Sequence, residues 1–258
     1  MTTGIVVAMS SERVQLDPHA STHTVERHGP WRVDWYSIGG EDIATVTSGI
    51  GMANAAAATE FLIQTMMPKR IINFGCAGAH RRDLVPGDVV IASELINHTL
   101  MQILPDGSER YTGYADETEG EHQHGVELRP DPTLIEIAEL AAAANPPEPW
   151  PRDLFWPASI PYRLPNVYLG PVVSADTWTQ AHDRLDTLHD RHGSLCEEME
   201  AAAIGRIAGM HGIPVLAIKD ISNNEYLRES DLAAFSDFPV AEVGKRAAAL
   251  VAQTIALL

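Results

Sequence analysis

The sequence predicts an α/β fold in which helices flank a doubly wound, mostly parallel central sheet. Short apolar runs alternate along the chain with longer stretches of helical periodicity, which is typical of strand-helix-strand units. The run 214–221 is largely apolar, as expected for a strand buried on both faces of a parallel sheet. The chain has 258 residues and no low-complexity linker, so we expect a single domain spanning residues 1–258.

The expected strands are short apolar runs at residues 4–8, 31–38, 43–47, 70–74, 88–94, 167–173 and 214–221. The expected helices show apolar residues at helical spacing and cover residues 52–67, 132–144, 200–211 and 240–257, with a shorter one at 183–189. Asp131 suits the N-cap of the second helix. Pro132 suits its first turn, where the missing N–H would have no intrahelical partner.

One region departs from this alternation, and we expect it to form an irregular excursion at about residues 97–165. Residues 97–129 are largely polar, and residues 145–165 contain seven prolines interleaved with aromatic side chains. A disordered linker is one interpretation of the second stretch. Because aromatic side chains usually need a surface to pack on, we favour an ordered loop against this subunit or a neighbouring one.

Charge and cysteine content exclude several classes of function. Lys and Arg total 18 against 35 Asp and Glu, so the formal charge of -17 would repel nucleic acid and anionic membrane surfaces, and we expect neither as a partner. The first residues lack a basic segment and a cleavage site, which predicts a cytoplasmic protein. Cys76 and Cys196 have no paired metal-ligand spacing, so we expect reduced thiols and no metal or cofactor, although one disulfide stays an alternative.

Two polar positions follow elements that should end at the same edge of the sheet. Glu200 stands at the start of the helix 200–211, and Asn223 stands at the carboxyl end of the strand that follows. In open α/β sheets, ligands bind in the crevice outside the carboxyl ends of the strands. We therefore predict that this acid and this amide face one ligand crevice.

Seven motifs occur in the order found in the purine nucleoside phosphorylase and nucleosidase superfamily, and the chain most resembles its methylthioadenosine/S-adenosylhomocysteine nucleosidase branch. These motifs are 4–12 (GIVVAMSSE), 48–51 (SGIG), 73–78 (NFGCAG), 86–90 (PGDVV), 174–178 (SADTW), 198–200 (EME) and 221–223 (ISN). The resemblance fails over about residues 97–165. It implies a phosphorylase/hydrolase-like fold, a purine nucleoside substrate, no cofactor, and a homo-oligomer with a dimer favoured.

The resemblance also implies roles for individual residues. In the resembling nucleosidases, the acid at the place of Glu12 activates the attacking water, and the Glu at the place of Glu200 binds the ribose hydroxyls. The Met at the place of Met199 packs under the sugar, and an aromatic at the place of Trp178 stacks on the purine. Carboxylates suit this reaction because cleavage of the N-glycosidic bond builds positive charge on the sugar. Further substrate-binding positions are Ile50, Gly51, Cys76, Ala77, Gly78, Thr179 and Glu198.

Each of these residues also has a structural interpretation. Glu12 would be a solvated surface carboxylate if it served no chemistry. Glu200 would interact favourably with the dipole of its helix. Trp178 and Met199 would be core side chains. A nucleophilic role for Cys76, with His80 close in sequence, is a further alternative to a buried thiol.

Asn223 departs from the resembling adenine nucleosidases, which place an Asp there to protonate the departing purine. An amide has no such proton to give, but its donor and acceptor suit a 6-oxopurine. We therefore predict hydrolysis of the N-glycosidic bond of a purine nucleoside, either a 6-oxopurine nucleoside or a 5′-modified one, or slow cleavage of an adenine nucleoside. A catalytically weak paralogue that only binds nucleosides is a second alternative.

A phosphate-dependent phosphorylase is the first alternative to a hydrolase. Bacterial phosphorylases of the superfamily hold phosphate with an Arg and a Ser, and this chain has Asn73 and Cys76 at those places. Loss of the guanidinium removes the strongest donor to a phosphate dianion, which favours hydrolysis. Phosphorolysis stays an alternative, because Arg81, Arg82 or an Arg of a second subunit would supply the cation that binds phosphate.

Overall fold

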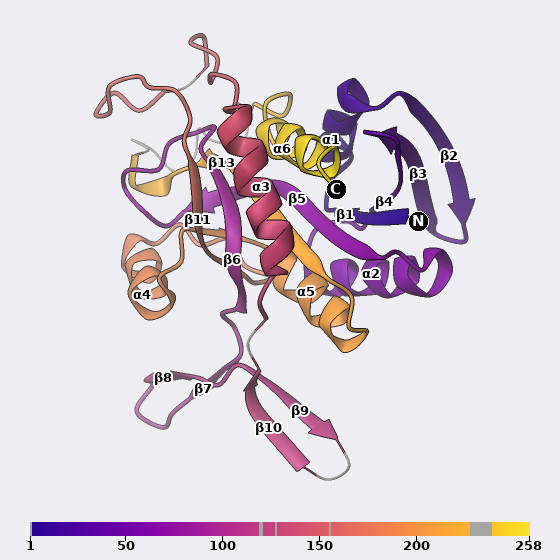
Figure 1. Ribbon diagram of the computed structural model, residues 1–258. Coiled ribbons are helices and arrows are strands. Elements are labelled where there is room, and N and C mark those ends of the chain that lie inside the picture. Colours follow the sequence, from indigo (N-terminus) through magenta and orange to yellow (C-terminus); the bar gives the residue numbers. More distant parts are fainter. Residues whose placement is uncertain (1, 119–120, 127, 155, 228–238) are drawn as a thin grey trace.

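The computed structural model describes residues 2–118, 121–126, 128–154, 156–227 and 239–258. Within these residues, a nine-stranded sheet lies between two layers of helices, in the strand order β12-β11-β6-β13-β5-β1-β4-β3-β2 (Figure 1). Its strands are β1 Thr2–Val7, β2 Thr22–His28, β3 Trp31–Ile38, β4 Glu41–Thr47, β5 Arg70–Ala79, β6 Val89–Asn97, β11 Val167–Ser174, β12 Cys196–Glu198 and β13 Val215–Asn223. The helices are α1 Ser10–Arg13, η1 Val14–His19, α2 Met52–Met66, α3 Pro132–Ala144, α4 His182–His192, α5 Ala201–Met210, η2 Glu225–Leu227 and α6 Lys245–Ile255.

The α/β class is confirmed, but the sheet is mixed rather than doubly wound and mostly parallel. Parallel pairing joins β4, β1, β5 and β13 and also joins β6, β11 and β12, whereas β13 pairs antiparallel with β6. The strands β2, β3 and β4 are antiparallel because short turns connect them, and a hairpin cannot join parallel strands. Gly29 and the pair Gly39-Gly40 supply the positive φ that these turns use.

Two apolar cores cover the two faces of the sheet. Helices α2 and α5 pack on one face and α3 and α6 on the other. On β1, Val6 lies in the first core and Ile5 and Val7 in the second, as the two-residue period of a strand requires. The many alanines of α2, α5 and α6 let these helices approach the sheet closely. No helix in the described ranges is long and apolar enough to cross a bilayer.

The helix ends show where local signals suffice and where they do not. Asp131 caps α3 as predicted, because its carboxylate accepts a hydrogen bond from the Leu134 N–H at 3.0 Å. The predicted helix 240–257 begins only at Lys245. The carboxylate of Asp220, on β13, accepts hydrogen bonds from Gly244 N at 2.9 Å and Arg246 N at 3.1 Å, and these contacts define the start of α6.

The region 97–165 contains regular structure that the sequence did not predict. It forms two small hairpins, β7 Met101–Ile103 with β8 Glu109–Tyr111, and β9 Tyr114–Thr118 with β10 Glu121–Val126, and both project from the sheet (Figure 1). The proline-rich stretch packs on α6 of the same subunit. There the buried Trp150 ring lies under the Arg246 guanidinium at 4.9 Å, and the Tyr162 hydroxyl donates to the Trp150 carbonyl at 2.5 Å. Phe155 falls outside the described residues.

Candidate active site

A cavity of about 180 Å³ lies at the carboxyl ends of β1, β5 and β13, beside the N-terminus of α5. This is the edge at which the sequence predicted a ligand crevice. All the predicted site residues line the cavity except Gly51, which lies at its margin and contacts Glu200. The lining residues are Ala8, Met9, Glu12, Ile50, Cys76, Ala77, Gly78, Ala79, His80, Thr177, Trp178, Thr179, Leu185, Glu197, Glu198, Met199, Glu200, Ser222, Asn223 and Glu225.

Glu12 lines the cavity and is buried, with 2% of its surface exposed, so it is not a solvated surface carboxylate. Its two oxygens accept hydrogen bonds from Cys76 N at 2.9 Å and Met9 N at 3.0 Å. Gly75 leaves room for this arrangement, because a β-carbon there would overlap the Glu12 carboxylate. Burial raises the pKa of Glu12, and the nearby charge of Lys219 partly opposes that rise. The result is a carboxylate that can accept a proton inside a dry site.

Glu200 occupies the N-cap position of α5 and reaches across the cavity to the start of α2. Its Oε1 accepts a hydrogen bond from the Gly51 N–H at 2.8 Å. Burial, and next the charge of Glu198, raise the pKa of Glu200 to about 7. Glu200 therefore changes its charge near neutral pH.

Glu198 anchors the helix that carries Glu200. Its Oε2 lies 2.7 Å from Lys219 Nζ, and its carboxylate also accepts hydrogen bonds from Ala201 N at 2.9 Å and from the Ser174 hydroxyl. Although Glu198 lines the cavity, its carboxylate oxygens already bind donors of the protein itself. The sequence analysis missed Lys219, whose signal is a single cation within the apolar run of β13.

Asn223 is held at both ends of its amide. Its Oδ1 accepts a hydrogen bond from the Ser222 hydroxyl at 2.8 Å, and its Nδ2 donates to Glu225 Oε1 at 2.7 Å. Glu225 is 6% exposed and lines the same cavity. The sequence analysis missed Glu225, although a carboxylate two residues beyond Asn223 at the end of a buried strand was a usable signal.

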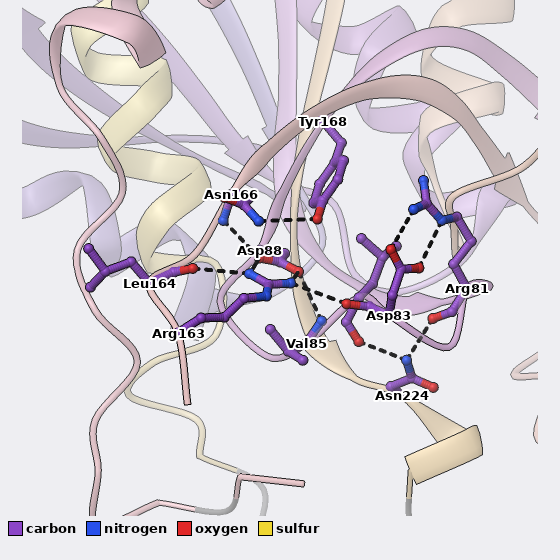
Figure 2. A network of polar contacts seen from close by, with 10 residues as sticks. Arg81, Asp83, Val85, Asp88, Arg163, Leu164, Asn166, Tyr168 and Asn224 are labelled. Atoms are coloured by element: carbon purple, nitrogen blue, oxygen red, sulfur yellow. Dashed lines mark hydrogen bonds and ion pairs between the residues drawn. The ribbon is translucent and has the colours of Figure 1, made fainter. Parts of the chain in front are cut away.

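Asn224 fixes the chain between these two residues, and Figure 2 shows its contacts. Its Nδ2 donates to the carbonyls of Arg81 at 2.7 Å and Leu84 at 2.8 Å. The same loop is tied to the sheet by Asp88, which is buried and pairs with Arg163 at 2.5 Å. The end of β13 is therefore held by contacts outside the cavity, which leaves Asn223 and Glu225 to face it.

A buried polar cluster forms another part of the cavity wall. Glu197 Oε1 lies 2.8 Å from His98 Nε2 and accepts from the Thr179 hydroxyl at 3.0 Å. Although burial opposes the shift, the nearby imidazoles of His80 and His98 lower the pKa of Glu197 to about 2. Glu197 is therefore expected to be ionised at neutral pH. Its Oε2 also accepts a hydrogen bond from the Thr179 backbone N–H at 3.1 Å.

The mouth of the cavity is apolar. Trp178 and Ile50 are 42% and 53% exposed, so Trp178 is a rim residue and not a core side chain. Met9 and Met199 also line the cavity and are partly buried. Flat and flexible apolar side chains of this kind suit a planar heterocycle joined to a sugar.

The thiols and arginines considered from the sequence do not supply charge to the cavity. Burial raises the pKa of the Cys76 thiol, which therefore stays protonated, and Cys76 and Cys196 are free rather than bridged. Arg81 pairs with Asp83 at 2.5 Å and Arg82 with Asp186 at 3.1 Å. No Arg or Lys occurs among the described residues that line the cavity, and the described part of the chain contains no cluster of metal ligands.

Comparisons with known proteins identify relatives of this chain. The sequence model of the phosphorylase superfamily matches residues 2–256. The 5'-methylthioadenosine/S-adenosylhomocysteine nucleosidase of Chromohalobacter salexigens is 28% identical over 230 residues, which cover 89% of this chain and 86% of that protein.

Two solved structures share the fold. The 5'-methylthioadenosine/S-adenosylhomocysteine nucleosidase of Neisseria meningitidis, in complex with methylthio-immucillin-A, aligns with a TM-score of 0.77 at 24% identity, over 100% of this chain and 99% of that one. The futalosine hydrolase of Helicobacter pylori strain 26695 aligns with a TM-score of 0.79 at 18% identity, over 100% and 98% of the two chains.

Proposed function

Because this chain belongs to the phosphorylase superfamily, we propose that it is a nucleosidase that hydrolyses the N-glycosidic bond of purine nucleosides. The match over residues 2–256 confirms the family predicted from the seven sequence motifs. The observation that carries the proposal is the cavity itself, in which buried carboxylates from separate elements converge and no described lining residue is Arg or Lys.

The chemistry of the bond supports this proposal. As the bond to the base breaks, the sugar becomes an oxocarbenium-like cation, which nearby carboxylates stabilise. Glu12 is the proposed base that takes a proton from the attacking water, since its burial raises its pKa toward the working range of a general base. Glu200 is the proposed acceptor for the ribose hydroxyls. Met199 is proposed to pack under the sugar and Trp178 to stack on the base, and both line the cavity.

Hydrolysis is favoured over phosphorolysis by the charge of the cavity. A phosphate dianion needs charge-assisted donors, and the carboxylate of Glu12 in the cavity lining would repel it. Asn73 stands where the phosphorylases have an Arg. It is buried, and its side-chain amide donates a hydrogen bond to the Val6 carbonyl at 2.9 Å, so it links β5 to β1. Arg81 and Arg82 are paired with surface carboxylates.

The proposal also concerns which purine base and which 5′ substituent the substrate carries. The amide at position 223 led to the prediction of a 6-oxopurine, and that prediction stands for experiment. A panel of inosine, guanosine, futalosine and methylthioadenosine, each assayed with and without phosphate, tests base and reaction together. We expect free ribose or its 5′-modified form, and no dependence on phosphate. Formation of a sugar 1-phosphate would establish the phosphorylase alternative instead, and tight binding without any product would establish the weak paralogue.

We also propose a homo-oligomer, with a dimer favoured. Trp178 and Ile50 leave large apolar surfaces exposed at the mouth of the cavity, which a second subunit would cover. Light scattering coupled to size-exclusion chromatography distinguishes the states, and a monomer at micromolar concentration would contradict the proposal.

A further inference from the structure

Asn223 leaves the proposed reaction without a proton for the departing base. A purine leaves poorly as an anion, so protonation of a ring nitrogen assists the cleavage. A neutral amide donates hydrogen bonds but transfers no proton at ordinary pH. Some other group must deliver that proton if the enzyme uses general acid catalysis.

We propose that Glu225 is the general acid that protonates the departing purine, and that Asn223 positions it. This inference rests on the proposed hydrolysis of a purine nucleoside. Glu225 is buried, lines the cavity, and is bound directly by the amide that stands at the leaving-group position, with Asn223 Nδ2 2.7 Å from Glu225 Oε1. The backbone of Glu225 is held as well, because its carbonyl lies 3.1 Å from His182 Nε2.

The other carboxylates that line the cavity make their side-chain contacts with groups other than Asn223. Glu198 pairs with the buried Lys219, and Glu197 with His98 and Thr179. Glu200 accepts from the Gly51 N–H and Glu12 from two backbone N–H groups, and the proposed function already gives both a role toward the sugar or the attacking water. Glu225 is the acid that Asn223 contacts.

Glu12 and Asn223, the contact of the proposed acid, line the same cavity and meet β5 at neighbouring positions. The Cys76 N–H binds Glu12, and Gly78 is the register partner of Asn223, so the two contact points lie two residues apart on β5. At the rise of a strand this is about 6.6 Å.

The proton balance of the step closes without a further reactant. Glu225 gives its carboxyl proton to a purine nitrogen as the C–N bond breaks, and the bond electrons stay with the base. Water adds its oxygen to the sugar carbon and gives a proton to Glu12. Transfer of one proton from Glu12 to solvent and of one from solvent to Glu225 restores the enzyme.

The test compares Glu225→Gln with the double variant Asn223→Asp/Glu225→Gln. Gln at 225 keeps an oxygen that can accept from Asn223 but has no acidic proton, so we expect kcat on purine nucleosides to fall about 100-fold or more with little change in KM. Asp at 223 restores an acid to the same place, and we expect the double variant to recover at least about tenfold of that loss. On 7-methylguanosine, whose base is already cationic and leaves without further protonation, Glu225→Gln should lose much less activity.

Glu136→Gln is the matched control, since it makes the same change at an exposed position on α3 and should leave kcat unchanged. An unchanged kcat in Glu225→Gln overturns the proposal. So does an equal loss on all substrates with no recovery in the double variant, because that pattern indicates a structural role. Failure of the wild-type protein to cleave any purine nucleoside would instead remove the proposed function itself.

Discussion

Lys219, which lies behind the cavity lining, forms a buried ion pair with Glu198, with Nζ 2.7 Å from Oε2. Against the effect of burial, the charges of Glu198 and Glu200 raise the pKa of Lys219, so the lysine stays charged. The pair joins β13 to the first turn of α5, whose N–H groups also bind Glu198. It thereby fixes Glu200 without taking part in the reaction that we propose.

Removal of Lys219 should destabilise the fold. Lys219→Met leaves Glu198 buried without its countercharge, and the loss of one partner of such a pair costs about 3 to 5 kcal/mol. Urea denaturation at neutral pH measures the change in the free energy of unfolding. Glu198→Gln in the Lys219→Met background removes the stranded charge and should recover part of the loss. A single variant that is destabilised by less than about 1 kcal/mol would contradict the importance of the pair.

Glu200→Gln should stabilise the protein at alkaline pH while it impairs activity. The pKa of Glu200 is raised from 4.5 to about 7, so the folded state holds this proton more tightly than the unfolded state does. The favourable contribution of Glu200 is therefore complete below pH 4.5 and is lost as the pH rises through about 7. Above that range the variant should exceed the wild type by about 1 to 3 kcal/mol. Unfolding measured at pH 4 and pH 8 checks this, and a pH-independent difference would disprove it.

Gly75→Ala should displace Glu12. A methyl group at this position would overlap the Glu12 carboxylate, so Glu12 must leave its hydrogen bond with the Cys76 N–H. We expect kcat to fall about 100-fold, as for loss of a general base. Gly209→Ala is the control, because Gly209 lies on the exposed side of α5 with open space around it. That change should keep activity and gain about 0.5 to 1 kcal/mol in helix propensity.

Neither cysteine should react readily in the folded protein. Burial raises the pKa of both thiols, and the charge of Glu12 adds to the effect at Cys76. Alkylation by iodoacetamide at pH 8 should therefore be slow until the chain is unfolded, when both thiols become accessible. Rapid modification of Cys76 with loss of activity would instead support a nucleophilic role for this thiol.

The sequence by itself determined the features that depend on short-range patterns. The α/β class, the cap at Asp131 and the packing of the proline-rich stretch follow from periodicity, turn chemistry and aromatic content, and each is present in the structure. All but one of the site residues predicted from the sequence line the cavity, because parallel strands bring their carboxyl ends to one edge whatever the details of the sheet.

Only the tertiary structure decided which distant groups meet. The antiparallel pairing of β13 with β6 and the start of α6 at Lys245 depend on contacts between segments far apart in the chain. The pairing of Lys219 with Glu198 likewise appears only when strand and helix are packed. Glu225 is close to Asn223 in sequence, but its burial depends on the loop that Asn224 binds. The physical reason is that an ionisable side chain acquires its role from its burial and its partners, which local sequence does not fix.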